Sequence, residues 1–555
     1  MDVPRFHTRH IPERHLDFAS LKAHEIKRSG LCDLVEGDRL CRLRDVGVEV
    51  VSTQVVWWEL EPEPGVFDWS RIERDIARIE RAGMKVGICP WFHYPPDWYL
   101  TSRPDHACFQ CLEHGTSTNI LSLWDPRTLE VYERLYGQLW ERLGSAVTYV
   151  SVGLSGDAGD VSYPAGATHY SFSPEHSHVG YWCGDAEARA SFARAMQGKY
   201  VEVEELNEAW GTAYECWEED LMPRVPFRAI ALVERSDFMR WYTRSLMEFL
   251  SRVCGVFRRC FRNVAASVSC GSVSEELAAG VVKSQMAKIA SEHHVGVRWR
   301  GMGNQVGFAR DNVPMKRLSS AAQFYGAAMS CETVHPFDPH NAAHVLYECH
   351  ANGAWLLQDD SLNIMRSLDV QLRLRPTLRV DPPKSSLAVF YPVETEMLEA
   401  PRTNMAVFVE QAANLRAHAD YDLCDSDMIW DDYLRAKTDL LFLVSCNIPH
   451  YTAELIVDFV VNGGRVWFYA GSVLSQLFGG DDLASLAAAA GCITYTHPVP
   501  SKPGLYHVDE WPAFEPYASL KKAGDQSGES YVTVHEEHVS TYLPVERQIL
   551  LSSGS

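Results

Sequence analysis

Hydrophobic and polar positions alternate between two periods along the first two thirds of the chain. Val48–Val56 is an apolar, β-branched run typical of a buried strand. Apolar residues then recur at helical spacing over Ile72–Ile79, preceded by Ser70 and Glu73 in the pattern of a capping box. Met84–Cys89 is the next apolar run. This succession predicts a strand, a helix and a second strand.

Further helices and strands follow in the same rhythm. Asp125 followed by Pro126 is typical of a helix start, and Gly144 of its end. The run 147–152 is the next strand, and the first strand of the chain is expected at 15–19. The later helices are predicted over 187–200, 236–262, 274–291, 315–325 and 339–352, and the later strands over 264–269, 295–299, 327–331 and 354–357.

The number of these units predicts the fold class. Consecutive strand–helix units give parallel strands joined by right-handed crossovers. About eight of them within residues 1–375 favour a closed (β/α)8 TIM barrel over an open sheet. We therefore expect an α/β protein whose first domain is this barrel.

A second domain is predicted after a linker. Prolines and charges replace the periodicity at 374–383. Strands are then expected at 386–391, 440–444 and 466–469, with a helix over 452–462. These elements predict a smaller flavodoxin-like α/β domain over 384–496, and the weak alternation of 497–555 predicts a short β-rich tail.

Composition narrows the choice of partners and compartment. The net charge of −22 is spread along 555 residues, which disfavours nucleic acid and anionic membranes as partners. No apolar run is long enough to span a membrane, and the first residues lack a signal-type apolar core. The fifteen cysteines lie mostly in apolar runs, which is typical of free thiols. We therefore expect a cytoplasmic protein.

One cysteine pair has the spacing of metal ligands. Cys108 and Cys111 form a Cys-x-x-Cys sequence with His106 and His114 beside it, and four such ligands would suffice for zinc. A loop with free thiols is the favoured alternative, because no second cysteine pair has suitable spacing. No metal and no other cofactor is expected, and zinc at Cys108 and Cys111 stays open.

Acidic residues follow two predicted strands. The run 147–152 breaks into a glycine-rich turn with Asp157 and Asp160, and the run 327–331 leads directly to Glu332. The loops after the strands of a (β/α)8 barrel meet at one face, where one protonated and one ionised carboxyl group can hydrolyse a glycosidic bond. We expect Asp160 and Glu332 to be catalytic. Turn formation and a rim salt bridge are the alternatives, and Asp157 competes for the role of acid.

Aromatic and polar residues at other strand ends suit a sugar. Sugars present apolar C–H faces between hydroxyl groups, so aromatic platforms with polar neighbours bind them. The loop 91–99 holds five aromatic residues and a histidine, although simple loop packing and rim ion pairs remain alternatives. The predicted substrate-binding residues are Trp58, Glu59, Trp91, His93, Trp98, Asp157, Trp182, Arg298, Trp299, Asn304, His335 and Asp359.

Several segments resemble glycoside hydrolase family 42, the β-galactosidases. The resemblance lies in Trp58–Trp69, Gly83–Pro90 and Pro96–Trp98, and the second domain with Asn462–Gly464 resembles the amidotransferase-like domain of that family. The resemblance implies a barrel β-galactosidase with Glu332 as the nucleophile. It also implies a homo-oligomer, a trimer or a dimer, formed through the second domain.

The segment after the fourth strand resembles a different barrel family. Val152–Pro164 is similar to the β-amylase segment in which Ala-Gly-Glu precedes Tyr-Pro, with Asp160 in the place of the general-acid glutamate. Aspartate is one methylene shorter, which retracts its carboxyl group. The Asn-Glu acid of family 42 is missing at this strand, and the four-cysteine zinc cluster of that family is not reproduced.

These patterns together predict a glycosidase that releases terminal sugars from an oligosaccharide or a glycoside. A retaining enzyme is expected, with carboxyl groups about 5 Å apart, and an inverting β-amylase-like enzyme, with about 6.5–9.5 Å, is the alternative. A catalytically silent sugar-binding barrel is a third reading, favoured by aspartate in place of glutamate. The sequence does not reveal which sugar or linkage is cut.

Overall fold

The computed structural model describes two compact units. One comprises Met1–Val306 and Tyr325–Pro382, and the other Gly307–Phe324 and Pro383–Ser555. The described residues are 8–11, 37–45, 48, 50–156, 159–164, 176, 178, 180–224, 232–271, 279–302, 308–333, 348–349, 351–354, 356–358, 385–394, 396, 408, 412, 415–416, 419–443, 448–469, 492–498, 504–507, 531–534 and 547–553.

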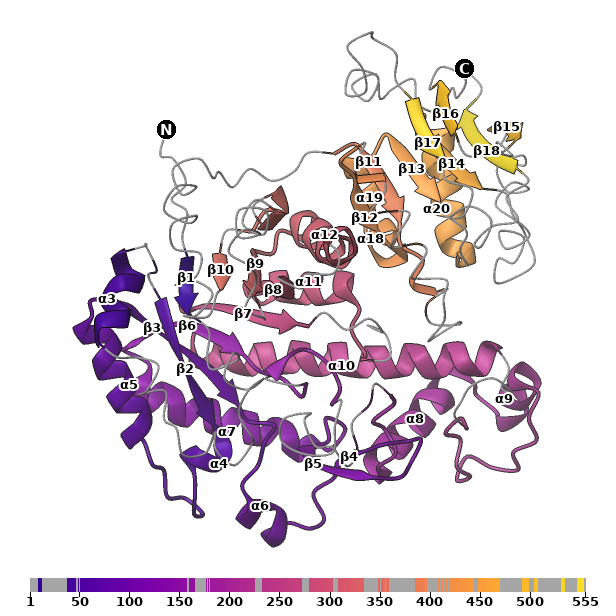
Figure 1. Cartoon of the computed structure of the whole chain (residues 1–555). Coiled ribbons are helices and arrows are strands. Elements are labelled where there is room, and N and C mark those ends of the chain that lie inside the picture. Colours follow the sequence, from indigo (N-terminus) through magenta and orange to yellow (C-terminus); the bar gives the residue numbers. More distant parts are fainter. Residues whose placement is uncertain are drawn as a thin grey trace. The chain divides into compact units, whose positions relative to one another are not determined.

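Eight parallel strands close the first unit into a barrel (Figure 1). In spatial order they are β1 (Thr8–Ile11), β10 (Leu356–Gln358), β9 (Met329–Thr333), β8 (Gly296–Met302), β7 (Ala265–Cys270), β6 (Val147–Val152), β3 (Lys85–Trp91) and β2 (Val50–Val56). Each strand pairs in parallel with both neighbours. The predicted TIM-barrel fold is confirmed.

The first barrel strand lies earlier in the chain than predicted. Strand β1 pairs with β2 and β10, whereas residues 15–19 lie outside the described residues. The sequence of β1, Thr-Arg-His-Ile, carries little apolar signal. Its place is set by pairing with the two neighbouring strands, which periodicity cannot show.

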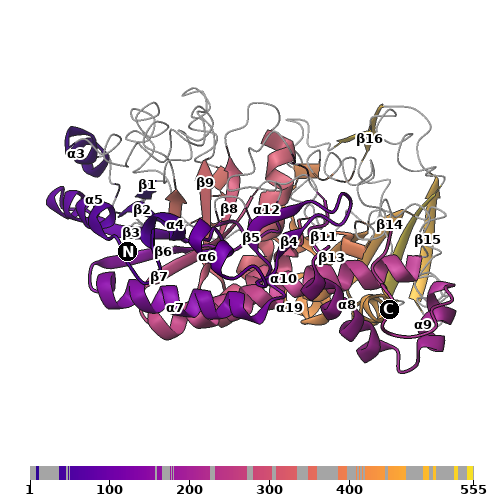
Figure 2. The same cartoon turned by 90° about the horizontal axis from the view of Figure 1, so that it is seen from below.

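Helices surround these strands, and Figures 1 and 2 show α7 and α10 running side by side next to them. The helices of this unit include α3 (Gly37–Asp45), α4 (Trp57–Leu60), α5 (Ser70–Arg81), α6 (Asp97–Ser102), α7 (Pro126–Leu143), α8 (Ala186–Lys199), α9 (Val203–Trp210), α10 (Leu232–Cys260) and α11 (Lys283–Glu292). None of the helices in the described part of the chain is long and apolar enough to span a membrane.

Helix α5 confirms its predicted apolar stripe but not its predicted cap. Ile72, Ile76 and Ile79 are buried. The capping box does not form, because the helix begins at Ser70 itself, whose N–H donates to Asp68 Oδ1 at 2.9 Å. An aspartate two residues upstream thus accepts the hydrogen bond from the start of the helix.

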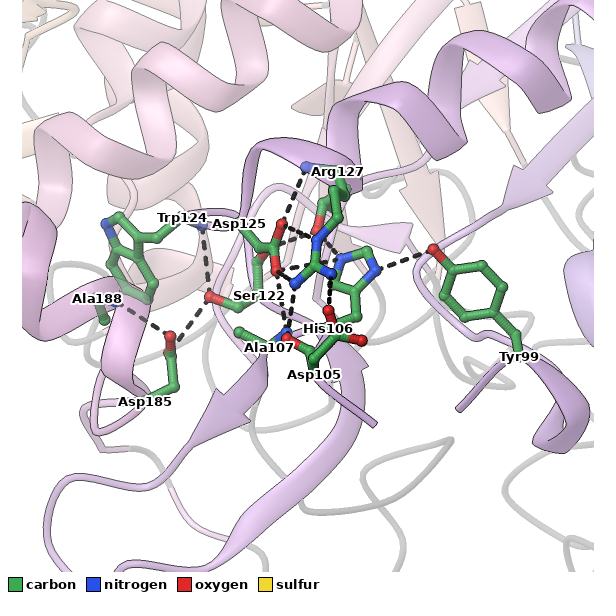
Figure 3. A network of polar contacts seen from close by, with 11 residues as sticks. Tyr99, Asp105, His106, Ala107, Ser122, Trp124, Asp125, Arg127, Asp185 and Ala188 are labelled. Carbon is green, nitrogen blue, oxygen red and sulfur yellow. Dashed lines mark hydrogen bonds and ion pairs between the residues drawn. The ribbon is translucent and has the colours of Figure 1, made fainter. Parts of the chain in front are cut away.

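A polar network joins the start of α7 to a hairpin that the sequence pattern did not predict, β4 (Cys108–Gln110) and β5 (Ser117–Leu121) (Figure 3). Asp125 caps α7, as expected, by accepting the Arg127 N–H at 3.0 Å. Its other oxygen accepts the N–H of Ala107, just before the hairpin, at 3.1 Å. In the same network His106 Nδ1 lies 2.9 Å from the Tyr99 hydroxyl.

The second unit contains a six-stranded sheet. Its order is β12 (Asp422–Cys424), β11 (Leu387–Phe390), β13 (Leu440–Leu443), β14 (Arg465–Tyr469), β18 (Arg547–Ser553) and β15 (Cys492–Pro498). The first four strands are parallel, and β18 runs antiparallel to both of its neighbours. The helices of this unit include α18 (Ser426–Trp430), α19 (Tyr433–Lys437) and α20 (His450–Val461), and β16 (Gly504–His507) pairs with β17 (Tyr531–Val534).

Helix α12 (Phe308–Tyr325) belongs to this second unit for nearly all of its length, although it connects β8 to β9. Lys316 on this helix is fully buried and lies 3.4 Å from Asp422 of β12. Asp422 also accepts a hydrogen bond from the Ser320 hydroxyl at 3.2 Å. Buried ion pairs and hydrogen bonds therefore hold α12 in this unit.

Candidate functional site

Asp160 lies in a tight turn that follows β6. Gly159 has a φ of +81°, and a Cβ there would lie 3.1 Å from Trp91 Cδ1, so glycine lets the turn pack closely on the end of β3. The Val161 N–H donates to the Ser269 carbonyl of β7 at 2.7 Å. The turn therefore holds Asp160 between the ends of two other barrel strands.

Glu332 lies near the carboxyl end of β9 and is fully buried. In the register of the barrel it stands opposite Arg300 of β8. Arg298, which is also buried, places its Nε 3.0 Å from Glu332 Oε2. Because side chains alternate along a strand, Arg298 and Arg300 project from the same side of β8.

Arg300 contacts both predicted catalytic carboxylates. Its Nη1 donates to Asp160 Oδ2 at 2.9 Å, and its Nε lies 3.8 Å from Glu332 Oε1. The structure thus brings Asp160 and Glu332 to two different nitrogens of one guanidinium group, although they are far apart in the chain.

Positive and negative side chains alternate among the described residues of this cluster. The order is Arg298, Glu332, Arg300 and Asp160, and both acids are less than a tenth exposed. Burial makes unpaired charge costly and strengthens the attraction between close opposite charges. Two acids held in this way can act on the same bond of a bound substrate. One can serve as the proton donor and the other as the nucleophile or base.

Three predicted substrate-binding residues gather around the ring of Tyr94. The ring centroids of Trp58 and Trp91 lie 5.6 Å and 6.2 Å from it, and that of His93 lies 3.9 Å away. Trp91 is the last residue of β3, next to the turn that carries Asp160. Trp91 thus lies next to the turn that carries one of the two carboxylates, and Tyr94 connects it to Trp58 and His93.

Two further predicted residues already have partners at the rim. Trp98 donates its Nε1–H to the Glu61 carbonyl at 2.8 Å. Glu59 forms an ion pair with Arg71, with Oε2 and Nη2 3.2 Å apart. Both are half-buried, so these contacts agree with the packing and ion-pair alternatives as well as with a substrate role.

The two remaining tryptophans of the predicted substrate site, Trp182 and Trp299, lie elsewhere. Trp299 projects from the side of β8 opposite to its two neighbouring arginines, and its ring lies 4.4 Å from Lys283 Nζ of α11. Trp182 stacks on His178 with a centroid distance of 5.5 Å. The predicted residues outside the described part of the chain are Asp157, Asn304, His335 and Asp359.

The residues whose spacing suggested a metal site do not all lie together in the structure. His106 takes part in the network of Figure 3. Cys111 lies instead in a cluster that includes two histidines from a distant segment. The members are Cys111, His114, His176 and His178, whose ligand atoms all lie within 4.8 Å of one another. Burial raises the pKa of the Cys111 thiol to about 11 and lowers the pKa of His176.

His176 and His178 are functional candidates that the sequence analysis missed. Their His-x-His spacing is a recognisable signal, because alternate residues of an extended segment project on the same side. Nothing in the sequence shows that this pair meets the Cys111–His114 turn.

Comparison with known proteins bears on the barrel unit. The sequence model of glycoside hydrolase family 42, described as β-galactosidase, matches residues 35–144 and 168–272. The chain resembles this family. β-Galactosidase BgaH of Haloferax lucentense is 26% identical over 177 residues, which are 32% of this chain and 24% of that protein.

A β-amylase and a solved structure are also similar. The thermophilic β-amylase of Thermoanaerobacterium thermosulfurigenes is 23% identical over 251 residues, covering 40% of this chain and 44% of the β-amylase. The chain thus spans less than half the length of these two curated relatives. The β-galactosidase structure from Rahnella sp. R3 has a TM-score of 0.64 and 14% identity, and the match covers 90% of this chain and 78% of that one. This likeness agrees with the TIM-barrel fold.

Proposed function

We propose that the chain is a glycoside hydrolase that releases terminal sugars, with a β-galactoside as the favoured substrate. In this proposal Glu332 is the nucleophile and Asp160 the acid/base. The supporting observation is that both carboxylates contact the guanidinium of Arg300 at the strand ends of one barrel. The similarity to β-galactosidases over 35–144 and 168–272 supports the same substrate class.

The remaining site residues extend this proposal. Trp58, Trp91 and His93 would form the sugar platform near Tyr94, and Arg298 would orient Glu332. An aromatic face packs on the C–H face of a pyranose, while the buried charges bind its hydroxyl groups. A retaining reaction follows if Glu332 attacks the anomeric carbon after Asp160 has protonated the leaving oxygen.

Activity measurements on both carboxylates test the proposal. Wild type, Asp160→Asn and Glu332→Gln are assayed on a panel of nitrophenyl glycosides. We expect turnover of the β-galactoside by wild type and a loss of more than about 10³-fold in each variant, because each removes one of the two required carboxyl groups. Glu208→Gln is the matched control, since Glu208 is exposed on α9 and belongs to an Asn-Glu pair outside the barrel strands. Background turnover of every sugar by wild type would favour the silent sugar-binding barrel.

An inverting, β-amylase-like activity is the second candidate. It is supported by the similarity to the thermophilic β-amylase and by the turn of Asp160. The first anomer released, observed by NMR during early turnover, separates the two mechanisms: a β-galactoside gives β-galactose by retention and α-galactose by inversion. Activity on maltooligosaccharides instead of the galactoside would favour the β-amylase-like reading.

The second unit and the cellular setting complete the proposal. We propose that the four parallel strands of this unit form the predicted flavodoxin-like domain and that it mediates a trimer or a dimer. Light scattering on the purified full chain tests this assembly. Most described cysteines are buried and all of them are free, which supports a reducing compartment such as the cytoplasm.

A further inference from the structure

A cysteine and three histidines converge at one point outside the carboxylate cluster. Cys111 Sγ lies 3.3 Å from His114 Nδ1 and 3.3 Å from His178 Nε2, and the latter lies 3.3 Å from His176 Nε2. The three imidazole centroids are each 4.9 Å from the other two. The rings also stand nearly perpendicular to one another, at 82°, 85° and 84°. Four donor atoms thus surround a common centre.

We propose that Cys111, His114, His176 and His178 bind one zinc ion. Zn²⁺ binds thiolate and imidazole at about 2.3 Å and 2.0–2.1 Å in a tetrahedron. A tetrahedron of that size has edges of about 3.3–3.4 Å between nitrogens and about 3.5 Å between sulfur and nitrogen. Three of the distances between the donor atoms are already at or near these values. The others do not exceed 4.8 Å, so small side-chain rotations complete the tetrahedron.

Hydrogen bonding explains this arrangement less well than a metal does. His178 Nε2 faces both Cys111 Sγ and His176 Nε2, and a single ring nitrogen carries at most one proton. It can therefore donate to only one of these two neighbours. A cation at the centre accepts an electron pair from all four atoms at once, and one thiolate with three imidazoles is a donor set that suits zinc.

The backbone brings the two ligand-bearing segments together. Cys111 and His114 lie in the turn between β4 and β5, which is closed by the Gly115 N–H donating to the Cys111 carbonyl at 2.8 Å. The Leu112 N–H in this turn donates to the Tyr181 carbonyl at 2.7 Å, which ties it to the segment that follows His178. The site is thus anchored on both sides by main-chain hydrogen bonds.

A carboxylate reinforces this anchoring. Glu113 accepts the Tyr181 N–H at 2.9 Å and lies 3.4 Å from Cys111 Sγ. A negative charge beside the site favours the cation, and outer-sphere groups of this kind orient metal ligands. The zinc is therefore structural: four protein ligands fill its coordination, and it fastens the β4–β5 hairpin to the segment before α8. Trp182, stacked on His178, is positioned by the same site.

Metal content and cobalt spectroscopy on the full chain test the proposal. The protein is expressed with added zinc, dialysed without chelator and analysed by elemental mass spectrometry, with one zinc per chain expected. Protein stripped of metal is then titrated with Co²⁺. We expect tetrahedral d–d absorption in the visible and a sulfur-to-cobalt charge-transfer band in the near ultraviolet, because Cys111 supplies a thiolate.

Matched variants assign the ligands. Cys111→Ser should abolish the charge-transfer band, and His176→Ala should weaken zinc binding by more than about 100-fold, beyond the 10–100-fold typical of losing an outer partner. Cys108→Ser is the control, since it removes the other cysteine of the same Cys-x-x-Cys sequence from outside the cluster. Less than about 0.1 zinc per wild-type chain, octahedral cobalt spectra, or unchanged binding in both ligand variants would overturn the proposal. These readouts do not depend on glycosidase activity. A negative result for zinc would therefore leave the proposed function untouched, and a negative activity result would leave the zinc proposal untouched.

Discussion

At the scale of single residues, the informative feature is the alternation along β8. Arg298 and Arg300 project to one side and pair with the two acids, whereas Trp299 projects to the other and lies against Lys283 of α11. The sequence analysis placed Arg298 and Trp299 in the same predicted site. Strand geometry separates them, because successive side chains of a strand point to opposite faces.

Arg300 is predicted to hold both proposed catalytic carboxylates in position. Its Nη1 donates to Asp160 Oδ2 at 2.9 Å, and its Nε lies 3.8 Å from Glu332 Oε1. Arg300→Met should lower kcat/KM for the glycoside that wild type hydrolyses by about 10²-fold through the loss of preorganised charge. Steady-state kinetics of both proteins on that glycoside provide the measurement.

Arg300→Lys serves as the control for this experiment. It keeps the positive charge and should recover part of the lost kcat/KM, although not the geometry of two contacts from one planar group. An unchanged kcat/KM in Arg300→Met would contradict the predicted role.

At the scale of elements, two helices of the barrel unit begin with buried aspartates whose surroundings differ. Asp125 caps α7 and is paired with Arg127, whose Nη2 lies 2.6 Å away. Asp185 caps α8 through the Ala188 N–H at 3.0 Å and accepts a hydrogen bond from the Ser122 hydroxyl at 3.2 Å (Figure 3). Burial raises the pKa of Asp185 to about 6. Burial would also raise the pKa of Asp125, but hydrogen bonds from Arg127 and Ala107 bring it below its ordinary value.

Asp185→Asn is predicted to stabilise the protein above pH 6. A carboxyl group whose pKa is raised on folding favours the folded state fully below its unfolded pKa, and this contribution is lost as the pH rises through about 6. Asparagine caps a helix equally well and carries no charge. Chemical denaturation measures the unfolding free energy of both proteins. The difference, variant minus wild type, should increase by about 2–3 kcal/mol as the pH rises from about 4 to about 8.

Asp125→Asn provides a control of opposite sign. The pKa of Asp125 is lowered on folding, so its stabilising contribution is present at neutral pH and is lost as the pH falls through its folded value. The variant should therefore be less stable than wild type at pH 7, and the gap should narrow only in acid. A pH-independent difference for Asp185→Asn would contradict the first expectation.

At the scale of the whole molecule, α12 links the two units by chain connectivity. It follows β8, which carries Arg300, and precedes β9, which carries Glu332, yet it belongs almost entirely to the second unit. Lys316 is fully buried beside Asp422, and Arg317 lies over the ring of Tyr391 at 3.7 Å. Unfolding of the second unit should therefore also disturb β8 and β9, which precede and follow α12 in the chain.

Asp422→Ala is predicted to destabilise the protein and to lower the temperature at which the proposed glycosidase activity is lost. The substitution removes one of two carboxylates near the buried Lys316, and Asp420 stays 3.3 Å away. The loss of stability should therefore be smaller than the about 3–5 kcal/mol that leaving a buried charge unpaired costs. The melting temperature and the half-life of activity on heating should fall together. Asp439→Ala, at an exposed site of the same unit, is the control and should change neither quantity. A lower melting temperature of Asp422→Ala with an unchanged half-life of activity would contradict the proposed coupling between the second unit and the barrel site.

Local periodicity predicted most of the barrel strands and several of the helices, because an apolar face must recur every second or every 3.6 residues to be buried. It also placed Asp160 and Glu332 at strand ends, where a closed barrel brings side chains together. The strand β1 was missed because its four residues carry little apolar signal and it forms by pairing with β2 and β10.

Contacts between distant segments were decided only by the tertiary structure. The pairing of both carboxylates with Arg300, the meeting of His176 and His178 with Cys111, and the place of α12 in the second unit all join residues far apart in the chain. The sequence determines these contacts physically, but no local pattern encodes them. They follow from strand register, the direction of each side chain and the packing of whole elements, which exist only once the chain has folded.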